Sequence, residues 1–401
     1  MRIRLPTEAS TLTRLAVLTS HPIQYHAPLF RVLAGCVDLT VFFAHKATAQ
    51  EQSRAGFGTA FEWDIDLTSG YTHDFLQNIS ALPGTDAFAG CDTPDIAARL
   101  SAGKFDALLV MGWHLKSYVQ GIYAAKRLRL PVMVRGDSHL GTPRPALKLA
   151  AKSLIYPPLL RLFDAALYVG VRSRAYYETY RFPQQRLFPS PHCVDTEWFA
   201  DRSTAQARAE LRRDLGVADR TTLLLFAGKL LPFKRPGDLL EAAARCRQNG
   251  SPIEVMIAGD GALREQIIAE AARLQVPLHL LGFCNQSRMP AVYSASDGLV
   301  LPSEGETWGL VANEALACGR PIIVSDACGC APDLTRDSRA GRVYPMADIA
   351  ALATSITALA KAPRAPMAID AISQAFSLKK ATEGIVAALD TVLVRRARSL
   401  A

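Results

Sequence analysis

The stretch LPSEGETWGLVANEALACGRPIIVSD, residues 301–326, decides how the rest of the chain is interpreted. Its apolar start runs into Pro302 and a polar loop, which is typical of a strand that ends in a loop. From Leu310 the apolar residues recur at helical spacing, and Gly319 and Pro321 stop the helix. The pattern predicts a strand, a tight loop, a short helix and a second strand. Because the free N–H groups and the positive dipole end of this helix face the loop, the loop is a predicted phosphate or diphosphate site.

Two carboxylates bracket this predicted site. Glu306 precedes the helix and Glu314 lies two turns inside it. At about 1.5 Å per residue they stand roughly 12 Å apart along the helix axis. That separation suits a nucleotide sugar, with one glutamate on sugar hydroxyls and the other on ribose hydroxyls. Glutamates are also common near helix N-termini for purely structural reasons, so the spacing alone leaves both interpretations open.

The string ETWGLVANEALACGRPIIV, residues 306–324, resembles the family-4 retaining glycosyltransferases. Their signature is a glutamate, seven further residues, a second glutamate, a helix end rich in small residues, and a Gly-x-Pro-x-hydrophobic strand. The resemblance covers most of the chain and is strongest over residues 223–334. It implies the GT-B fold, in which two doubly wound, Rossmann-like α/β domains face each other across a cleft. It also implies transfer of a sugar from a nucleoside diphosphate sugar to an acceptor hydroxyl, with retention at the anomeric carbon.

Length and alternation support two domains. The 401 residues exceed the usual size of a single core, and alternating apolar strands and helical stretches are typical of the α/β class. We expect an N-terminal acceptor-binding domain over residues 1–202 and a C-terminal nucleotide-sugar-binding domain over residues 203–375. The resemblance implies that a last helix, over residues 376–401, packs back on the N-terminal domain.

The resemblance assigns most of the donor site to the C-terminal domain. Lys229 and Lys234 lie in a loop after an apolar strand, where the family places an arginine and then a lysine on the diphosphate. A lysine is a point charge rather than a bidentate fork. With Glu306, these lysines are the expected catalytic residues on the donor side. The expected donor-binding residues are Glu314, Gly228, Gly259, Gly261, Phe283, Gly305, Thr307, Trp308 and Gly309.

The acceptor side is predicted less sharply. Asp137 and His139 follow a predicted strand, near the place where family members often carry a functional histidine, and they are the catalytic candidates on this side. A surface loop histidine is the alternative for His139. The first loop, SHPIQYHAPLF over residues 20–30, carries His21 and His26 where the family usually has glycines. Strand ends facing a cleft bind ligands in open α/β sheets, which adds His114, Lys116 and Arg135.

No cofactor and no metal are expected. Asp64 and Asp66 superficially match the DXD motif that binds divalent metals in a different glycosyltransferase fold. The alternation of apolar and polar residues from Trp63 to Leu67 is explained more simply by a half-buried strand. Cys328 and Cys330 lack the neighbouring ligands that a zinc site needs. The donor substrate would be a nucleoside diphosphate sugar, and the resemblance implies that the reaction needs no metal.

Composition and charge limit the location and the partners. The formal charge of +8 fits an anionic partner, and eight scattered cysteines are typical of a reducing compartment. The first apolar patch, Leu15–Leu18, is too short for a signal peptide, so we expect a cytoplasmic protein. The basic and apolar residues 143–163 leave peripheral contact with the inner face of a membrane open, against a plain connecting helix. Pro157 and Pro158 are expected to break any long helix there.

The expected partners are a nucleotide sugar and an acceptor glycan or lipid-linked glycan, and no nucleic acid. The setting implied by the resemblance is cell-surface polysaccharide, lipopolysaccharide or glycolipid synthesis. A nucleotide-sugar epimerase on the same fold is the alternative enzyme, and it would form product without a second substrate. A non-catalytic polyanion-binding protein is the alternative from another class. It would bind polyanions in a salt-dependent way and would not be stabilised by UDP or GDP.

Overall fold

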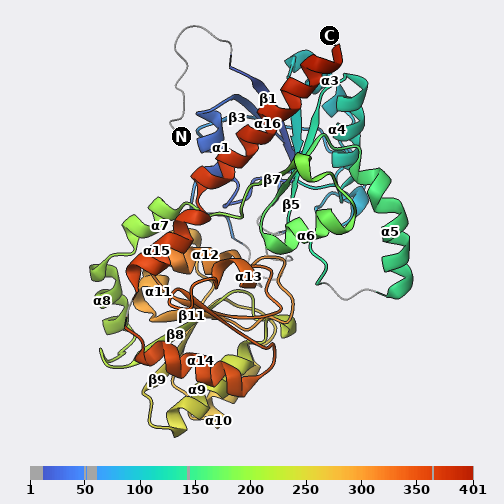
Figure 1. Cartoon of the computed structure of the whole chain (residues 1–401). Helices are drawn as coiled ribbons and strands as arrows, with labels where there is room; N and C mark the ends of the chain where they lie inside the picture. The colour runs from blue at the N-terminus through green and yellow to red at the C-terminus, as the bar shows by residue number, and fades with distance from the viewer. Residues whose placement is uncertain (1–11, 49–50, 52–60, 142–144, 364, 401) are drawn as a thin grey trace.

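A computed structural model describes residues 12–48, 51, 61–141, 145–363 and 365–400. Figure 1 shows two α/β domains, each with helices on both faces of a sheet. The N-terminal sheet has seven strands in the order β3-β2-β1-β4-β5-β6-β7, and the C-terminal sheet has six in the order β10-β9-β8-β11-β12-β13. Neighbouring strands are parallel in both sheets. The prediction of two doubly wound α/β domains is confirmed.

The N-terminal strands are short apolar runs. Ala107–Val110 is buried at every position, as expected for a parallel strand covered on both faces. The strands are β1 (Arg14–Thr19), β2 (Asp38–Phe43), β3 (Thr72–Phe75), β4 (Ala107–Val110), β5 (Val132–Gly136), β6 (Ala165–Tyr168) and β7 (Leu187–Pro189). The helices are α1 (Ala27–Ala34), α3 (Ile96–Gly103), α4 (Lys116–Arg127), α5 (Ala146–Leu160) and α6 (Val171–Thr179), with short 3-10 turns η2 (Phe88–Gly90) and η3 (Gln184–Arg186).

The C-terminal domain repeats this architecture around the stretch that opened the sequence analysis. Its strands are β8 (Thr222–Ala227), β9 (Ile253–Ala258), β10 (Leu278–Gly282), β11 (Gly298–Leu301), β12 (Ile322–Ser325) and β13 (Gly341–Tyr344). Its helices are α7 (Thr196–Arg202), α8 (Ala205–Asp214), α9 (Pro236–Gln248), α10 (Arg264–Arg273), α11 (Met289–Ala295), α12 (Leu310–Ala317), α13 (Ala331–Leu334), α14 (Ile349–Lys361) and α15 (Pro366–Ala375). Two 3-10 turns, η4 (Pro232–Lys234) and η5 (Gln286–Arg288), lie in its loops.

The chain crosses between the domains twice. α7 packs against α11 and α12 of the C-terminal domain, so the first crossing lies before Thr196 and not at residue 202. The second crossing leads into α16 (Leu378–Leu400), which lies across the N-terminal domain in Figure 1 and contacts α1, β6 and β7. Its buried residues in the N-terminal core are Ala381, Ile385, Ala388, Leu389 and Val392.

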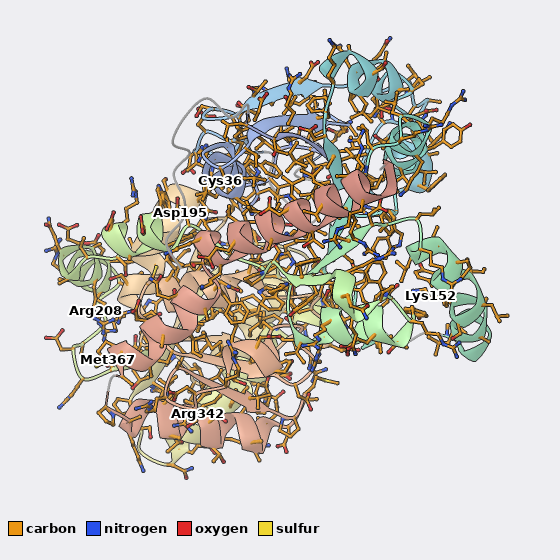
Figure 2. The ribbon with its side chains drawn as sticks, turned by 45° about the horizontal axis from the view of Figure 1, so that its top comes forward. Cys36, Lys152, Asp195, Arg208, Arg342 and Met367 are labelled. Carbon is orange, nitrogen blue, oxygen red and sulfur yellow. The ribbon has the colours of Figure 1, made fainter. Side chains whose placement is uncertain are left out.

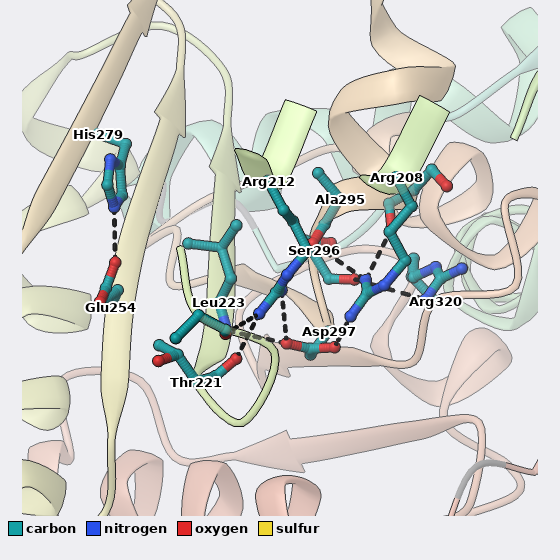
Figure 3. Close-up of polar contacts among 12 residues, drawn as sticks. Arg208, Arg212, Thr221, Leu223, Glu254, His279, Ala295, Ser296, Asp297 and Arg320 are labelled. Carbon is teal, nitrogen blue, oxygen red and sulfur yellow. Dashed lines mark hydrogen bonds and ion pairs between the residues drawn. The ribbon is translucent and has the colours of Figure 1, made fainter. Parts of the chain in front are cut away.

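A buried charge cluster fixes the start of β11. Asp297, the residue before this strand, accepts hydrogen bonds from Arg208 at 2.6 Å and from Arg212 at 3.3 Å, as Figure 3 shows. The backbone N–H of Leu223 donates to the same carboxylate at 2.9 Å. Because Arg212 is 4% exposed, removing Asp297 would leave a buried cation without its carboxylate partner, held by backbone carbonyls. The cluster therefore ties α8 to the strand that leads into the loop at residues 303–309.

The predicted strand between Trp63 and Leu67 is wrong, since strand structure begins only at Thr72. The carboxylate of Asp66 accepts the backbone N–H groups of Thr68 and Ser69 at 2.8 and 3.0 Å. Such a local turn competes with the hydrogen bonds of a sheet.

The predicted break at Pro157 and Pro158 is also wrong, because α5 runs through both prolines and ends at Leu160. Each proline leaves the carbonyl four residues earlier without its helical donor. These carbonyls belong to Ser153 and Leu154, which are exposed, so water can satisfy them.

Candidate active site

A cavity of about 720 Å³ opens between the two domains at the carboxyl ends of β8, β9 and β11. The C-terminal domain contributes Lys229 and Lys234 after β8, Gly259 after β9 and the loop 305–309 after β11. The N-terminal domain contributes Gln24, Tyr25, Trp63, Asp137 and His192. The carboxyl ends of the strands are where open α/β sheets bind ligands. This cavity is therefore the candidate site.

Lys234 and Glu306 meet at the centre of the cavity. The ammonium of Lys234 donates to the carboxylate of Glu306, and their side chains are only 15% and 19% exposed. Ser303 also donates its hydroxyl to Glu306, at 3.3 Å. Lys229 lines the same cavity, and burial together with repulsion from Lys234 lowers the pKa of its ammonium. Two cations and one carboxylate therefore share a partly desolvated space, which attracts an anion.

The loop that carries Glu306 is fixed by its backbone. The carbonyl of Glu306 accepts the N–H of Gly329 at 2.8 Å, and Trp308 Nε1 donates to Asn313 Oδ1 at 2.8 Å. Gly309 starts α12 with a φ of 101°, and a Cβ there would lie 2.7 Å from a methyl group of Leu301. Only glycine meets both conditions without strain. The loop thus turns tightly and brings the N-terminal end of α12 to the cavity, as predicted.

Glu314 is more deeply buried than Glu306. Its carboxylate accepts the hydroxyl of Tyr293 at 2.6 Å and the amide of Gln286 at 3.5 Å. Burial raises the pKa of Glu314 to about 7. The residue lines the main cavity and also an adjoining hollow of about 330 Å³. It is therefore placed to contact a ligand in the cavity.

The glycines after β8 and β9 allow the two loops to touch. A Cβ on Gly259 would lie 1.8 Å from the carbonyl oxygen of Gly228, and both residues have positive φ angles. Gly261 similarly approaches the carbonyl of Leu230, at 2.7 Å from a built Cβ. Gly228 and Gly259 line the cavity and Gly261 is not among its lining residues. Of the other predicted donor residues, the cavity is lined by Phe283, Gly305, Thr307, Trp308 and Gly309.

Of the two catalytic candidates on the acceptor side, Asp137 and His139, the cavity is lined by Asp137 alone. Asp137 lines the cavity, and its carboxylate lies 3.7 Å from Nε2 of His192. Burial raises the pKa of Asp137, but the contact with His192 and the nearby charge of Arg135 offset this effect, so that the pKa lies below its usual value. His139 is not among the lining residues, and its Nδ1 accepts the N–H of Gly141 at 3.0 Å.

Most of the other predicted site residues of the N-terminal domain make contacts within that domain. His21 Nδ1 lies 3.0 Å from the hydroxyl of Ser20, and burial and the neighbouring His45 lower the pKa of His21 to about 4. His26 is buried beside Tyr25. The remaining three are His114, which is exposed, Lys116, which pairs with Asp92 at 2.6 Å, and Arg135, which donates to Ser190 and to the carbonyl of Pro191.

Sequence reasoning missed several lining residues of the cavity. They are Gln24, Tyr25, Trp63, His192 and Gln286. The first loop was predicted at the acceptor side, but the prediction rested on its histidines instead of on Gln24 and Tyr25. His192 was not among the residues predicted for the site. A cleft between distant segments leaves no signal in the spacing of residues along the chain.

The two carboxylates of the DXD pair make separate contacts with the protein. Asp64 accepts the backbone N–H and the hydroxyl of Ser287, while Asp66 caps the turn described above. Within the described residues no group of three or more His, Cys, Asp or Glu side chains is arranged to hold a metal ion. Cys328 and Cys330 are both buried. In the same described ranges, no helix combines the length and the apolar character that crossing a bilayer requires.

Comparison with known proteins finds a family match within the C-terminal domain. Residues 207–375 match the family described as Glycosyl transferases group 1. The chain is 33% identical over 238 residues to the D-inositol 3-phosphate glycosyltransferase of Geodermatophilus obscurus, covering 54% of this chain and 50% of the relative. It is 28% identical over 282 residues to the enzyme of the same name from Thermomonospora curvata, covering 63% and 61%. The chain thus spans about half the length of the first of these relatives.

Solved structures resemble the whole chain in fold. The Anabaena protein HepE in complex with UDP and glucose superposes with a TM-score of 0.68 at 18% identity, covering 94% of this chain and 99% of that one. The alpha,alpha-trehalose 6-phosphate synthase of Burkholderia multivorans superposes with a TM-score of 0.69 at 16% identity, covering 96% and 100%. At these identities the likeness shows the fold alone.

Proposed function

We propose that this chain, whose residues 207–375 belong to the group 1 glycosyl transferases and which has the GT-B fold, transfers a hexosyl-type sugar from a nucleoside diphosphate sugar to an acceptor hydroxyl, with retention at the anomeric carbon. The observation that carries the proposal is the contact of Lys234 with Glu306 in the cavity between the domains, beside the start of α12. Lys229 adds a second cation to the same cavity. This is the charge arrangement that a diphosphate joined to a sugar requires.

The proposed chemistry follows from where charge develops. As the bond between the anomeric carbon and the diphosphate breaks, negative charge grows on the leaving oxygen. Lys229, Lys234 and the backbone N–H groups near Gly309 stabilise that charge, because they are already oriented in a partly desolvated site. Glu306 orients sugar hydroxyls and Glu314 the ribose. The acceptor oxygen attacks from the same face, and its proton passes to the departing phosphate.

A test of donor binding can also show whether this binding needs a metal ion. In excess EDTA, one of UDP, GDP, ADP or dTDP, or its sugar conjugate, is expected to raise the melting temperature, because a ligand that binds only the folded state stabilises it. The two lysines supply the positive charge that a metal supplies in other sites. Thermal-shift measurements with and without EDTA provide the readout. Stabilisation that vanishes in EDTA would favour a metal site after all, and the absence of stabilisation by any of these ligands would contradict the proposed function.

We also propose a cytoplasmic location with peripheral membrane contact through α5. Leu154 and Ile155 on its outer face are 79% and 59% exposed, while Tyr156 packs on Tyr180 with ring centroids 5.1 Å apart. A solvated helix normally carries polar residues on its outer face. Figure 2 shows Lys152 on this helix, which stands at the edge of the N-terminal domain. Between residues 138 and 163 the sequence has four cations and no acidic residue: Arg144, Lys148, Lys152 and Arg161.

The position of α5 supports a lipid-linked acceptor in cell-surface polysaccharide, lipopolysaccharide or glycolipid synthesis. α5 follows β5, and Asp137, at the end of β5, lines the cavity. A membrane at α5 would therefore lie on the acceptor side. This acceptor class differs from the inositol phosphate in the names of the curated relatives.

The double substitution Leu154→Glu with Ile155→Glu is expected to reduce binding to vesicles containing phosphatidylglycerol by about tenfold or more. Each apolar side chain of this size contributes about 1.5–3 kcal/mol when it is fully buried, and the new charges repel the anionic lipid. Vesicle sedimentation measures the binding. Met367→Glu, at a site that is 87% exposed on the C-terminal domain (Figure 2), is the matched control and should bind like the wild type. Equal binding by the double variant and the wild type would contradict the membrane contact.

A further inference from the structure

Residues 61–66, called the strap here, belong to the N-terminal half of the chain but are held by the C-terminal domain. Asn285 donates its side-chain amide to the carbonyl of Glu62 at 2.7 Å. Ser287 donates its backbone N–H to Asp64 Oδ1 at 3.1 Å, and its hydroxyl donates to the same carboxylate. Asp64 therefore binds the 3-10 turn η5, next to the cavity. Asp64, which matches the DXD pattern in the sequence, thus links the two domains, and its contact with Ser287 is called the latch here.

Aromatic contacts join the strap to the same edge of the cavity. The ring of Phe61 lies 4.2 Å from the ring of Phe283, measured between centroids, and Trp63 packs on Phe61 at 5.0 Å. Phe61 is 9% exposed, so it is the buried member of the group. Trp63 is half-buried and lines the cavity together with Phe283. The aromatic wall of this end of the cavity is therefore built from both domains.

The other end of the strap is fastened to its own domain. Arg31 on α1 donates to the carbonyl of Ser69 at 3.0 Å and also to the carbonyl of Asp66. The turn capped by the Asp66 carboxylate lies between these two contacts. Because one end is bound by α1 and the other by η5, the strap holds Trp63 at the boundary between the domains.

We infer that the strap completes the nucleoside end of the donor site, with Trp63 and Phe283 as the two aromatic residues that contact the base. The inference rests on the proposed function, which puts the diphosphate at Lys229 and Lys234. Glu314, which the proposed function puts at the ribose, accepts a hydrogen bond from Gln286 at 3.5 Å. Gln286 and Phe283 line the same cavity, so the base of an attached nucleoside would lie toward Phe283. Stacking on aromatic side chains is available to every base because each base has a π face. The N-terminal domain thus contributes to donor affinity as well as to acceptor binding.

The substitution Trp63→Ala tests the base contact. We expect it to weaken binding of the most stabilising nucleoside diphosphate by about tenfold or more, the range measured when an aromatic partner of a base is removed. Inorganic pyrophosphate should bind the variant and the wild type equally, because it reaches only the lysines. Trp63→Phe should retain most of the nucleoside diphosphate affinity. Titration calorimetry measures both ligands.

The substitution Asp64→Asn tests the latch without removing an aromatic residue. Asp64 is exposed, so the fold should tolerate the change, and we expect a smaller loss of nucleoside diphosphate affinity in the same direction. The matched control is Asp74→Asn, which removes another exposed carboxylate of this domain, paired with Arg99 at 3.1 Å. The control should bind both ligands normally.

Three results would overturn the inference. They are unchanged nucleoside diphosphate affinity in both Trp63→Ala and Asp64→Asn, an equal loss for pyrophosphate, or a wild type that binds pyrophosphate as tightly as every nucleoside diphosphate. Failure of the proposed function looks different. In that case the strap variants would still lose nucleoside diphosphate affinity selectively, but no sugar would be transferred to any acceptor by the wild type.

Discussion

Lys234→Ala is expected to lower kcat by about a hundredfold or more, the loss found when one oriented group that stabilises transition-state charge is removed. Two effects act in the same direction. The leaving diphosphate loses a cation, and the carboxylate of Glu306 loses its partner in a site where it is only 19% exposed. An unpaired carboxylate there repels the anionic donor.

The measurement for this variant is kcat with saturating donor, so that a loss of affinity does not hide the loss in the chemical step. Lys380→Ala is a suitable control because Lys380 pairs with Glu383 on α16, where its side chain is 54% exposed. The control should retain the wild-type rate. A kcat within a few-fold of wild type in Lys234→Ala would rule out the proposed role of the lysine.

Glu306→Gln is expected to lower kcat by about a hundredfold or more as well, but with a different effect on binding. Glutamine keeps the shape of the side chain and loses its charge. The charge-assisted hydrogen bonds to sugar hydroxyls weaken, whereas the affinity for a nucleoside diphosphate should not fall, because a negative charge near the diphosphate has been removed. This variant is therefore expected to lose turnover while it keeps its affinity for the nucleoside diphosphate.

Glu304→Gln is the matched control for Glu306→Gln. It makes the same chemical change two residues earlier in the same loop, at an exposed side chain outside the lining of the cavity. It should leave kcat and affinity unchanged. Equal losses in the two variants would show that the loop is sensitive to charge in general, and would remove the specific role of Glu306.

Much of the donor side could be predicted because its determinants are local. The strand, loop and helix at residues 301–326 follow from apolar spacing, from Gly309 and from the stop at Gly319 and Pro321, and the structure has β11, α12 and β12 there. The resemblance to glycosyltransferases agrees with the family match over residues 207–375, and the predicted GT-B fold is confirmed by the solved structures.

The acceptor side could be predicted only in part. Asp137 and His139 stand two residues apart in the sequence, and yet one lines the cavity and the other bonds its own loop. The alternation at Trp63–Leu67 predicts a strand, although Asp64 binds the other domain and Asp66 caps a local turn instead. Local periodicity describes how a segment would fold on its own neighbours, and it carries no information about a partner more than two hundred residues away.

The sequence by itself determined the α/β class of fold and the short helix between Glu306 and the strand at 322, because each depends on hydrophobic spacing or turn chemistry within about a dozen residues. Lys229 and Lys234, in contrast, were assigned through the resemblance to a family. Tertiary structure alone decided that Lys234 meets Glu306 across 72 residues, that Asp64 latches onto Ser287 across 223, and that α5 keeps an apolar face uncovered. These outcomes depend on how the two domains approach each other, and the approach is set by the summed packing of surfaces that no single stretch of sequence contains.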